Sequence, residues 1–206
     1  MKLIIAGAGG HGKVACDVAM ATNQWSEIYF VDDRYPELEM VLGKKVIGRF
    51  DDLEHLNKNK DFCIIVAIGN NPKRLSLIKH LLELGYECPV LIHPSAVVSQ
   101  YAIIDHGSVI FPNVVINANA KIGIGAIINT GAVIEHDCVL GEGVHISPNA
   151  GLAGGAKVGN GSWIGINACV IEQVIIGNHV IVGAGSVAIE NVADNQKIVG
   201  VPGRAI

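Results

Sequence analysis

The sequence lacks any long uninterrupted hydrophobic run, which argues against a chain that crosses a bilayer as a helix. Half of its 206 residues are hydrophobic, and its mean hydropathy is +0.42. The longest apolar run, around residues 63–68, still falls far short of the roughly 18 residues that a spanning helix needs. Such a run suits a buried strand, so we expect no membrane partner.

The chain also lacks a cluster of basic residues and a recognisable signal peptide. Its net charge is −4 and its pI is about 6.0, so we do not expect nucleic acid or an anionic membrane as a partner. Met1 and Lys2 lead directly into a short apolar stretch and a glycine loop, which is not a signal-peptide pattern. We therefore expect a cytoplasmic protein.

Cysteine motifs are absent as well, because the five cysteines show neither a CxxC pair nor a disulfide spacing. We interpret them as reduced thiols of the core, with a nucleophilic cysteine as the alternative. No cluster of metal-ligating residues is visible, so no metal is expected. The cysteines are Cys16, Cys63, Cys88, Cys138 and Cys169.

An aliphatic residue recurs every six positions through the second half of the chain, and a small or β-branched residue follows each by four positions. This period fits neither an amphipathic helix nor an alternating strand. It is typical of a hexapeptide β-helix, in which short strands coil into a prism with the aliphatic position on the axis. The aliphatic positions are Ile92, Val98, Ile104, Ile110, Ile116, Ile122, Ile128, Ile134, Leu140, Ile146, Leu152, Val158, Ile164, Val170, Ile176 and Val182.

The period places an all-β solenoid domain over residues 93–206. Sixteen hexads, at three hexads a coil, make about five coils that stack to roughly 24 Å. The tail from Ala188 leaves the pattern, and residues 200–204 are expected to form a loop that closes the last coil.

Residues 1–92 have a different rhythm, in which short apolar runs alternate with segments of helical period. This order predicts a small parallel sheet covered by helices, which is a Rossmann-like α/β domain. We expect residues 35–45 to be a loop. The predicted strands are 2–6, 27–31, 62–68 and 89–92, and the predicted helices are 13–22, 51–57 and 75–84.

A glycine motif, Gly7-x-Gly9-x-x-Gly12, follows the first predicted strand and opens the first helix. Glycines allow backbone N–H groups to approach a diphosphate at a helix N-terminus. Asp32 and Asp33 end the second strand, where they could bind the sugar or base of a nucleotide. An NAD-linked dehydrogenase is the main alternative, although ninety residues supply only half of a dinucleotide fold; a simple tight turn is another.

His136 stands between two acids in the solenoid and at an outward corner of its hexad. His145 follows nine residues later, which is half of an 18-residue coil, so the two histidines lie on different sides of one prism. They can meet only across two subunits, which predicts an active site between subunits of a cyclic oligomer. The alternative is that both are solvated surface histidines.

The chain resembles the NeuD/PglD group of sugar acetyltransferases over essentially its full length. The matching features are Gly-Ala-Gly-Gly-His-Gly at residues 7–12, Ala-Ile-Gly-Asn-Asn at 67–71, Asn-Thr-Gly-Ala-Val-Ile-Glu-His-Asp-Cys at 129–138, and Val-Gly-Val-Pro-Gly-Arg near the C-terminus. The resemblance implies a left-handed parallel β-helix, a homotrimer, acetyl-CoA as donor and a nucleotide-linked amino sugar as acceptor.

The resemblance also implies site residues. His136 corresponds to the general base and Asp137 to the partner that raises its basicity, although the family often has Glu at the latter position. The acetyl-CoA site would comprise His145, Gly154, Ile166 and Ala184. The sugar-nucleotide site would comprise Ala8, Gly9, Gly10, His11, Asp32, Asp33 and Gly69, with Asn129 near the base.

The implied reaction needs a base, an oxyanion donor and no covalent intermediate. A histidine titrates near neutrality and can take the acceptor's proton, and N–H groups of Gly154 and Gly155 could bind the oxyanion. We expect N-acetylation of a UDP-4-amino-4,6-dideoxysugar for a bacterial glycan. The alternatives are O-acetylation of sialic acid or another sugar, and a non-catalytic sugar-nucleotide-binding module.

Overall fold

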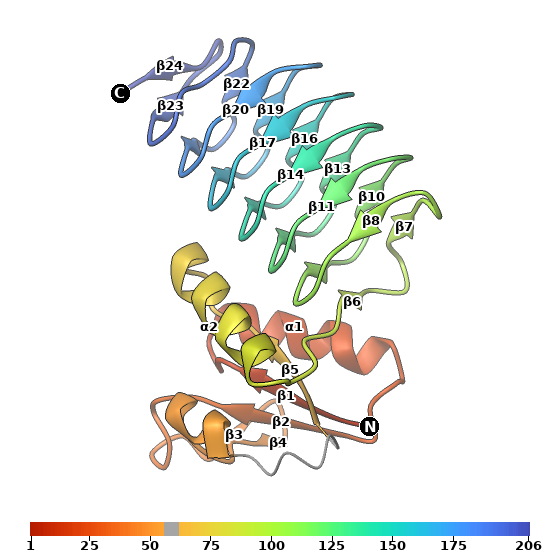
Figure 1. Ribbon diagram of the computed structural model, residues 1–206, viewed down its shortest axis with the longest axis vertical. Coiled ribbons are helices and arrows are strands. Elements are labelled where there is room, and N and C mark those ends of the chain that lie inside the picture. Colours follow the sequence, from red (N-terminus) through yellow and green to blue (C-terminus); the bar gives the residue numbers. More distant parts are fainter. Residues whose placement is uncertain (56–61) are drawn as a thin grey trace. The chain divides into compact units, whose positions relative to one another are not determined.

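The computed structural model describes residues 1–55 and 62–206, which form two compact units, Met1–Leu91 and Ile92–Ile206. Figure 1 shows an α/β unit and a solenoid of stacked coils. The predicted fold class, an α/β unit followed by a hexapeptide-repeat β-helix, is confirmed. Within the described ranges, neither helix has the length and apolarity that crossing a membrane requires.

The first unit contains a three-stranded parallel sheet with the strand order β2-β1-β5. The strands are β1 (Lys2–Ala6), β2 (Glu27–Val31) and β5 (Phe62–Val66). Leu3, Ile4 and Ile5 of the central strand are fully buried, as an apolar strand covered on both faces must be. Helix α1 (Gly10–Ala21) packs against β1, and α2 (Asn71–Glu83) packs against β5.

Both helices begin earlier than the apolar period predicts. The glycine loop itself supplies the first turn of α1, from Gly10 instead of residue 13. Helix α2 begins at Asn71 because Pro72 occupies its first turn and the Asn70 side chain accepts a hydrogen bond from the Lys73 N–H at 3.0 Å. Cap and proline signals therefore outweigh the onset of hydrophobic periodicity.

The segment predicted as a loop over residues 35–45 contains an antiparallel hairpin of β3 (Met40–Val41) and β4 (Lys44–Lys45). Its two-residue turn places Leu42 and Gly43 at φ +49° and +71°. The predicted helix 51–57 is a 3-10 helix, η1 (Phe50–His55), and its last two residues lie outside the described ranges.

The fourth predicted strand of the α/β unit was wrongly placed. Residues of 89–92 form β6 (Leu91–Ile92), which pairs with β9 in a sheet of the solenoid instead of extending the first sheet. The hydrophobic run looked like a Rossmann strand, yet Ile92 already belongs to the six-residue series.

The solenoid is built of three parallel sheets whose strands pair with partners 18 residues away, as in Val115, Val133 and Gly151. It has about six turns instead of the predicted five, because strands continue past Val182 to residue 199. One sheet contains β7 (Val97–Val98), β10 (Val115–Ile116), β13 (Val133–Ile134), β16 (Gly151–Leu152), β19 (Cys169–Val170) and β22 (Val187–Ala188).

The second sheet contains β8 (Ile103–Ile104), β11 (Lys121–Ile122), β14 (Val139–Leu140), β17 (Lys157–Val158) and β20 (Ile175–Ile176). The third contains β6, β9 (Val109–Ile110), β12 (Ile127–Ile128), β15 (His145–Ile146), β18 (Trp163–Ile164), β21 (Ile181–Val182), β23 (Lys197–Val199) and β24 (Arg204–Ala205). The last two strands are antiparallel and end the solenoid where a closing loop was predicted. We call these sheets the β13, β14 and β15 sheets.

The predicted side-chain pattern matches the coil geometry. From Ile110 to Val182 the aliphatic residue of each hexad is buried, and Ile134 and Ile146 are fully buried, whereas Ile92 at the start of the series is exposed. The small residue fills the tight corner, as Ala132 and Ala150 do without any exposed surface. This regular packing fixes which residues of each corner point outward, and His136 is one of them.

Candidate active site

His136 and Asp137 form a hydrogen-bonded pair on the corner between β13 and β14. The His136 Nδ1 atom lies 2.8 Å from Asp137 Oδ2, and the two side chains are 63% and 58% exposed. Since the carboxylate accepts, the bonded Nδ1 donates, and in the neutral imidazole Nε2 is then the nitrogen with the lone pair. The pair thus directs the proton-accepting nitrogen of the neutral ring away from Asp137 on an open corner, which is what a general base requires.

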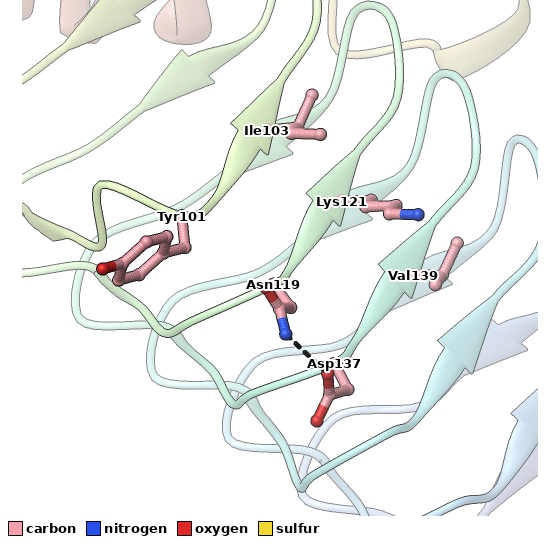
Figure 2. Close-up of a pocket in the computed structure, with 6 residues that line it drawn as sticks. All are labelled: Tyr101, Ile103, Asn119, Lys121, Asp137 and Val139. Carbon is pink, nitrogen blue, oxygen red and sulfur yellow. Dashed lines mark hydrogen bonds between the residues drawn. The ribbon is translucent and has the colours of Figure 1, made fainter.

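Asp137 has a backbone conformation that suits its residue type. Its φ is +62°, in the left-handed region that Asp and Asn tolerate better than Glu. Its second oxygen, Oδ1, accepts a hydrogen bond from Asn119 Nδ2 at 3.3 Å, which Figure 2 marks. The bond to His136, and secondarily that to Asn119, lower the pKa of the Asp137 carboxyl. The carboxylate therefore stays ionised beside the imidazole.

Gly154 lies one coil beyond His136, at the same corner, and faces its ring. A Cβ atom on Gly154 would lie 2.6 Å from His136 Nε2, so only glycine accommodates the ring in this position. The neighbouring Gly155 N–H donates to the His136 carbonyl at 2.9 Å. That bond within the solenoid makes Gly155 unsuitable as the predicted oxyanion donor, and leaves the Gly154 N–H as the candidate.

His145 lies in the β15 sheet, on a different side of the coil from the His136 corner, as predicted. Its ring stacks on Trp163, with 5.3 Å between ring centroids and 5° between planes. Trp163 Nε1 donates to Ser147 Oγ at 2.6 Å, which fixes the indole. Trp163 was not among the predicted site residues, although its position 18 residues after His145 indicates that it lies beside His145 on the next coil.

Ile166 and Ala184 lie on consecutive coils at the corner between the β15 and β13 sheets, and both are exposed. The Gly185 N–H donates to the Ile166 carbonyl at 2.8 Å. Asn129 lies at the same corner, where its side chain accepts from the Thr130 N–H at 2.8 Å. One protomer therefore brings only Gly154 to His136, and the other predicted acetyl-CoA residues and Asn129 lie elsewhere on the prism.

The predicted sugar-nucleotide residues follow the carboxyl ends of three adjacent parallel strands. Ala8 to His11 follow β1, Asp32 and Asp33 follow β2, and Gly69 follows β5. This is the edge at which open α/β sheets bind ligands. Gly12 is required for packing, since a Cβ there would lie 1.9 Å from the Gly7 carbonyl oxygen, whereas Gly9 and Gly10 face open space.

Asp32 has a mainly structural role in this loop cluster. Its carboxylate accepts from the Ala8 N–H at 2.8 Å and from the Arg34 Nε and Nη2 atoms at 2.7 and 3.1 Å. The bond to Arg34 is the main cause that lowers the pKa of Asp32 to about 2. Because both carboxylate oxygens of Asp32 are engaged, Asp32 shapes the glycine loop. Asp33 is the more exposed of the two acids, and its backbone carbonyl accepts from Arg49 Nη2 at 2.7 Å.

Arg74 supports the loop after β5, and the sequence analysis missed it. It is 1% exposed, and its Nη1 donates to the Ile68 carbonyl at 3.0 Å. Burial lowers the pKa of Arg74 to about 10. An arginine within a helix is ordinarily solvated, so nothing in the sequence marked this one as buried.

Four of the five cysteines are buried, as predicted for core thiols, and are not suited to nucleophilic catalysis, whereas the prediction was wrong for Cys169, which is exposed. Burial raises the pKa of Cys138, and it raises the pKa of Cys63 and of Cys88 to about 12. Cys169 is the exposed one. Among the described residues, no group of three or more His, Cys, Asp or Glu side chains could hold a metal ion.

Comparisons with known proteins match both units. The PglD N-terminal domain family matches residues 2–81, and the bacterial transferase hexapeptide family matches residues 119–154 and 155–188. UDP-N-acetylbacillosamine N-acetyltransferase of Bacillus subtilis is 40% identical over 111 residues, which is 53% of this chain. The chain thus matches only half the length of that curated relative.

Solved structures match over the whole chain. The acetyltransferase domain of PglB from Neisseria gonorrhoeae is 41% identical, with a TM-score of 0.97 over 100% of this chain and 99% of that one. PerB from Caulobacter crescentus, solved with CoA and GDP-perosamine, is 37% identical, with a TM-score of 0.91 over 100% and 97% of the chains. The protein therefore belongs to the PglD-type family of hexapeptide-repeat sugar acetyltransferases.

Proposed function

We propose that the protein transfers the acetyl group of acetyl-CoA to the amino group of a nucleotide-linked amino sugar, with His136 as general base. The observation that carries this proposal is the hydrogen bond from His136 Nδ1 to Asp137, which makes Nε2, on the side of Gly154, the proton-accepting nitrogen of the neutral ring. Relatives at 41% and 37% identity have been solved with acetyl-CoA, and with CoA and GDP-perosamine.

In the proposed reaction the acceptor's amine attacks the thioester carbon. His136 Nε2 takes a proton from the nitrogen, the C–S bond breaks, and the CoA sulfur leaves and receives a proton. Asp137 stabilises the imidazolium that forms and holds the ring in one tautomer. The same base would serve a hydroxyl acceptor, so O-acetylation of a sugar is the alternative within this class.

We propose a homotrimer with active sites between subunits. His136 and His145 lie on different sides of one protomer, so a single chain does not join them. The outward positions of the β13 sheet carry no charge, which suits a face that packs against a neighbour. These positions are Val97, Val115, Val133, Gly151, Cys169 and Val187.

The acceptor would bind beside the coils that precede His136 in the chain, and the donor would bind beside the coils that follow it. Gly154 lies one coil beyond the base. On the preceding coils, a hollow of about 330 Å³ borders Asp137. Figure 2 shows the apolar side chains and the Lys121 ammonium that line it. Its lining residues are Tyr101, Ile103, Asn119, Lys121, Asp137 and Val139.

This hollow suits the acceptor's sugar. The apolar surfaces of Ile103 and Val139 suit a deoxysugar methyl group, and Lys121 suits the negative charge of a diphosphate. We propose a UDP-4-amino-4,6-dideoxysugar as acceptor. Separately, we propose that the loops after β1, β2 and β5 of the α/β unit bind a nucleotide. We also propose that the reaction occurs in the cytoplasm.

The test is thiol release from acetyl-CoA with a panel of nucleotide amino sugars. His136→Ala should lower kcat by about 10²–10⁴-fold. The matched control is His106→Ala, because His106 is also an exposed corner histidine beside an aspartate, at 3.9 Å from Asp105. Near-normal turnover of His136→Ala would remove the assignment of the base.

A further inference from the structure

We infer that Asn119 is a positioning residue that holds the Asp137 carboxylate in the orientation in which it bonds His136. The inference rests on the proposed function, because it extends the pair of His136 and Asp137 by one member. The Asn119 side chain donates to Asp137, and it is Asp137 that bonds the imidazole, so the effect of Asn119 passes through Asp137.

The two contacts use different oxygens of one carboxylate. Asn119 Nδ2 donates to Oδ1 at 3.3 Å, while Oδ2 lies 2.8 Å from His136 Nδ1. Asp137 is 58% exposed, so water would otherwise compete for both oxygens and the carboxylate would be free to rotate. With both oxygens engaged, rotation about the Cβ–Cγ bond breaks at least one hydrogen bond. Asn119 therefore restricts the carboxylate to the plane that His136 needs.

The backbone makes this arrangement stiff. Asn119 and Asp137 occupy the same corner position on consecutive coils and have φ values of +60° and +62°. The Asp137 N–H donates to the carbonyl of Ala118 at 3.0 Å, and the adjacent Lys121 and Val139 are paired strand partners. Two short side chains on coils in register have little freedom to move apart. The distance between them is thus set by the solenoid.

Residue type alone does not explain Asn119, because asparagine is common at left-handed corner positions. Asn113, Asn149 and Asn167 have φ values of +59°, +55° and +55° and lie at another corner, without an aspartate at the equivalent position of the next coil. Asn119 shares their backbone conformation, but it lies at the corner of the base and bonds the partner of the base. This difference supplies a matched control.

The experiment compares Asn119→Ala with Asn113→Ala, which removes an asparagine from the same backbone conformation and leaves Asp137 untouched. We expect Asn119→Ala to lower kcat by about fivefold more than the control, since a net hydrogen bond contributes about 1 kcal/mol. The KM for acetyl-CoA should stay unchanged.

A second variant, Asn119→Asp, keeps a residue that tolerates the left-handed corner and replaces the donor by an anion. It should lose at least as much activity as Asn119→Ala, since two carboxylates would repel each other. If the backbone preference alone mattered, Asn119→Asp would behave as the unaltered protein. That result, or equal kcat values for Asn119→Ala and Asn113→Ala, would overturn the inference.

A measurement without turnover separates this inference from the proposed function. The ¹⁵N resonances of His136 report which ring nitrogen carries the proton. Asn119→Ala should reduce the Nδ1-protonated form, whereas Asn113→Ala should not. If the unaltered protein shows no acetyl transfer but Asn119→Ala still changes the His136 signals, the proposed function is contradicted and the positioning role is supported. If the unaltered protein is active and Asn119→Ala leaves the signals unchanged, the positioning role is contradicted and the proposed function is supported.

Discussion

The His136 imidazole lies where a side chain on Gly154 would be, since a Cβ atom there would be 2.6 Å from Nε2 and 2.7 Å from Cε1. Both atoms belong to the far end of a side chain that is itself exposed. An added methyl group would therefore move the ring and leave the coil intact. This relationship makes Gly154 a determinant of where the proposed base stands.

The Gly154→Ala substitution should lower the activity of the enzyme without unfolding it. We expect a fall in kcat of about 10–100-fold, because the ring is displaced from the attack geometry, and almost no change in Tm. The control is Gly48→Ala of the α/β unit, because a Cβ atom there would also lie 2.6 Å from the end of a side chain, at Asp52 Oδ2. Sedimentation should show that both variants keep the oligomeric state. Full activity of Gly154→Ala would mean that the ring works in another position.

Mixed oligomers test the site between subunits. His136→Ala and His145→Ala should each be weakly active alone, yet together they should recover about a quarter of normal activity. With random mixing, about three quarters of the trimers contain both variants, and each of these has one interface with both histidines. Co-expression with two affinity tags measures this recovery. A site contained within one chain would give no recovery at all.

The salt bridge at Asp32 predicts a stability that depends on pH. The folded pKa, about 2, lies below the ordinary value of 3.8, so the contribution is complete above the ordinary pKa and is lost as pH falls toward 2. Asp32→Asn should cost about 1–2 kcal/mol at neutral pH, since Arg34 is largely solvated.

Urea unfolding at several pH values checks this dependence on Asp32. The difference between the unaltered protein and Asp32→Asn should narrow as pH drops below about 4. Asp33→Asn is the control, since the salt bridge to Arg34 is made by Asp32, whereas the Asp33 carboxylate accepts from the Phe50 N–H at 3.4 Å. A difference that stayed constant with pH would contradict the ionic origin of this stabilisation.

The sequence predicted the solenoid in more detail than the α/β unit, for a physical reason. A period of six with 18 residues a coil determines which positions face inward, and so placed His136 on a corner and His145 on another side. Strand ends in the first unit depend on caps and turns, as at Asn70 and Leu42, and these have weaker signals.

The contacts of the candidate site depend on neighbouring coils and therefore appear only in three dimensions. The bond from Asn119 to Asp137, the ring of His136 over Gly154 and the stacking of His145 on Trp163 each join residues 18 positions apart. A residue-by-residue analysis identified four of these six residues. Asn119 and Trp163 could have been found by comparing each candidate with its equivalents one coil away.

Lys121 tests which side of His136 receives the acceptor. Its ammonium lies at the rim of the hollow beside Asp137, and Lys121→Ala should raise the KM for the nucleotide sugar by about 5–10-fold, as loss of a charge-assisted contact does. The KM for acetyl-CoA should not change, because the proposed donor residues lie on later coils. Lys157→Ala is the matched control, since Lys157 occupies the same outward position of the β14 sheet two coils further on. Equal KM values for the nucleotide sugar in the two variants would mean that the acceptor does not bind in the hollow. A raised KM for acetyl-CoA in Lys121→Ala would mean that the donor, instead of the acceptor, binds beside Lys121.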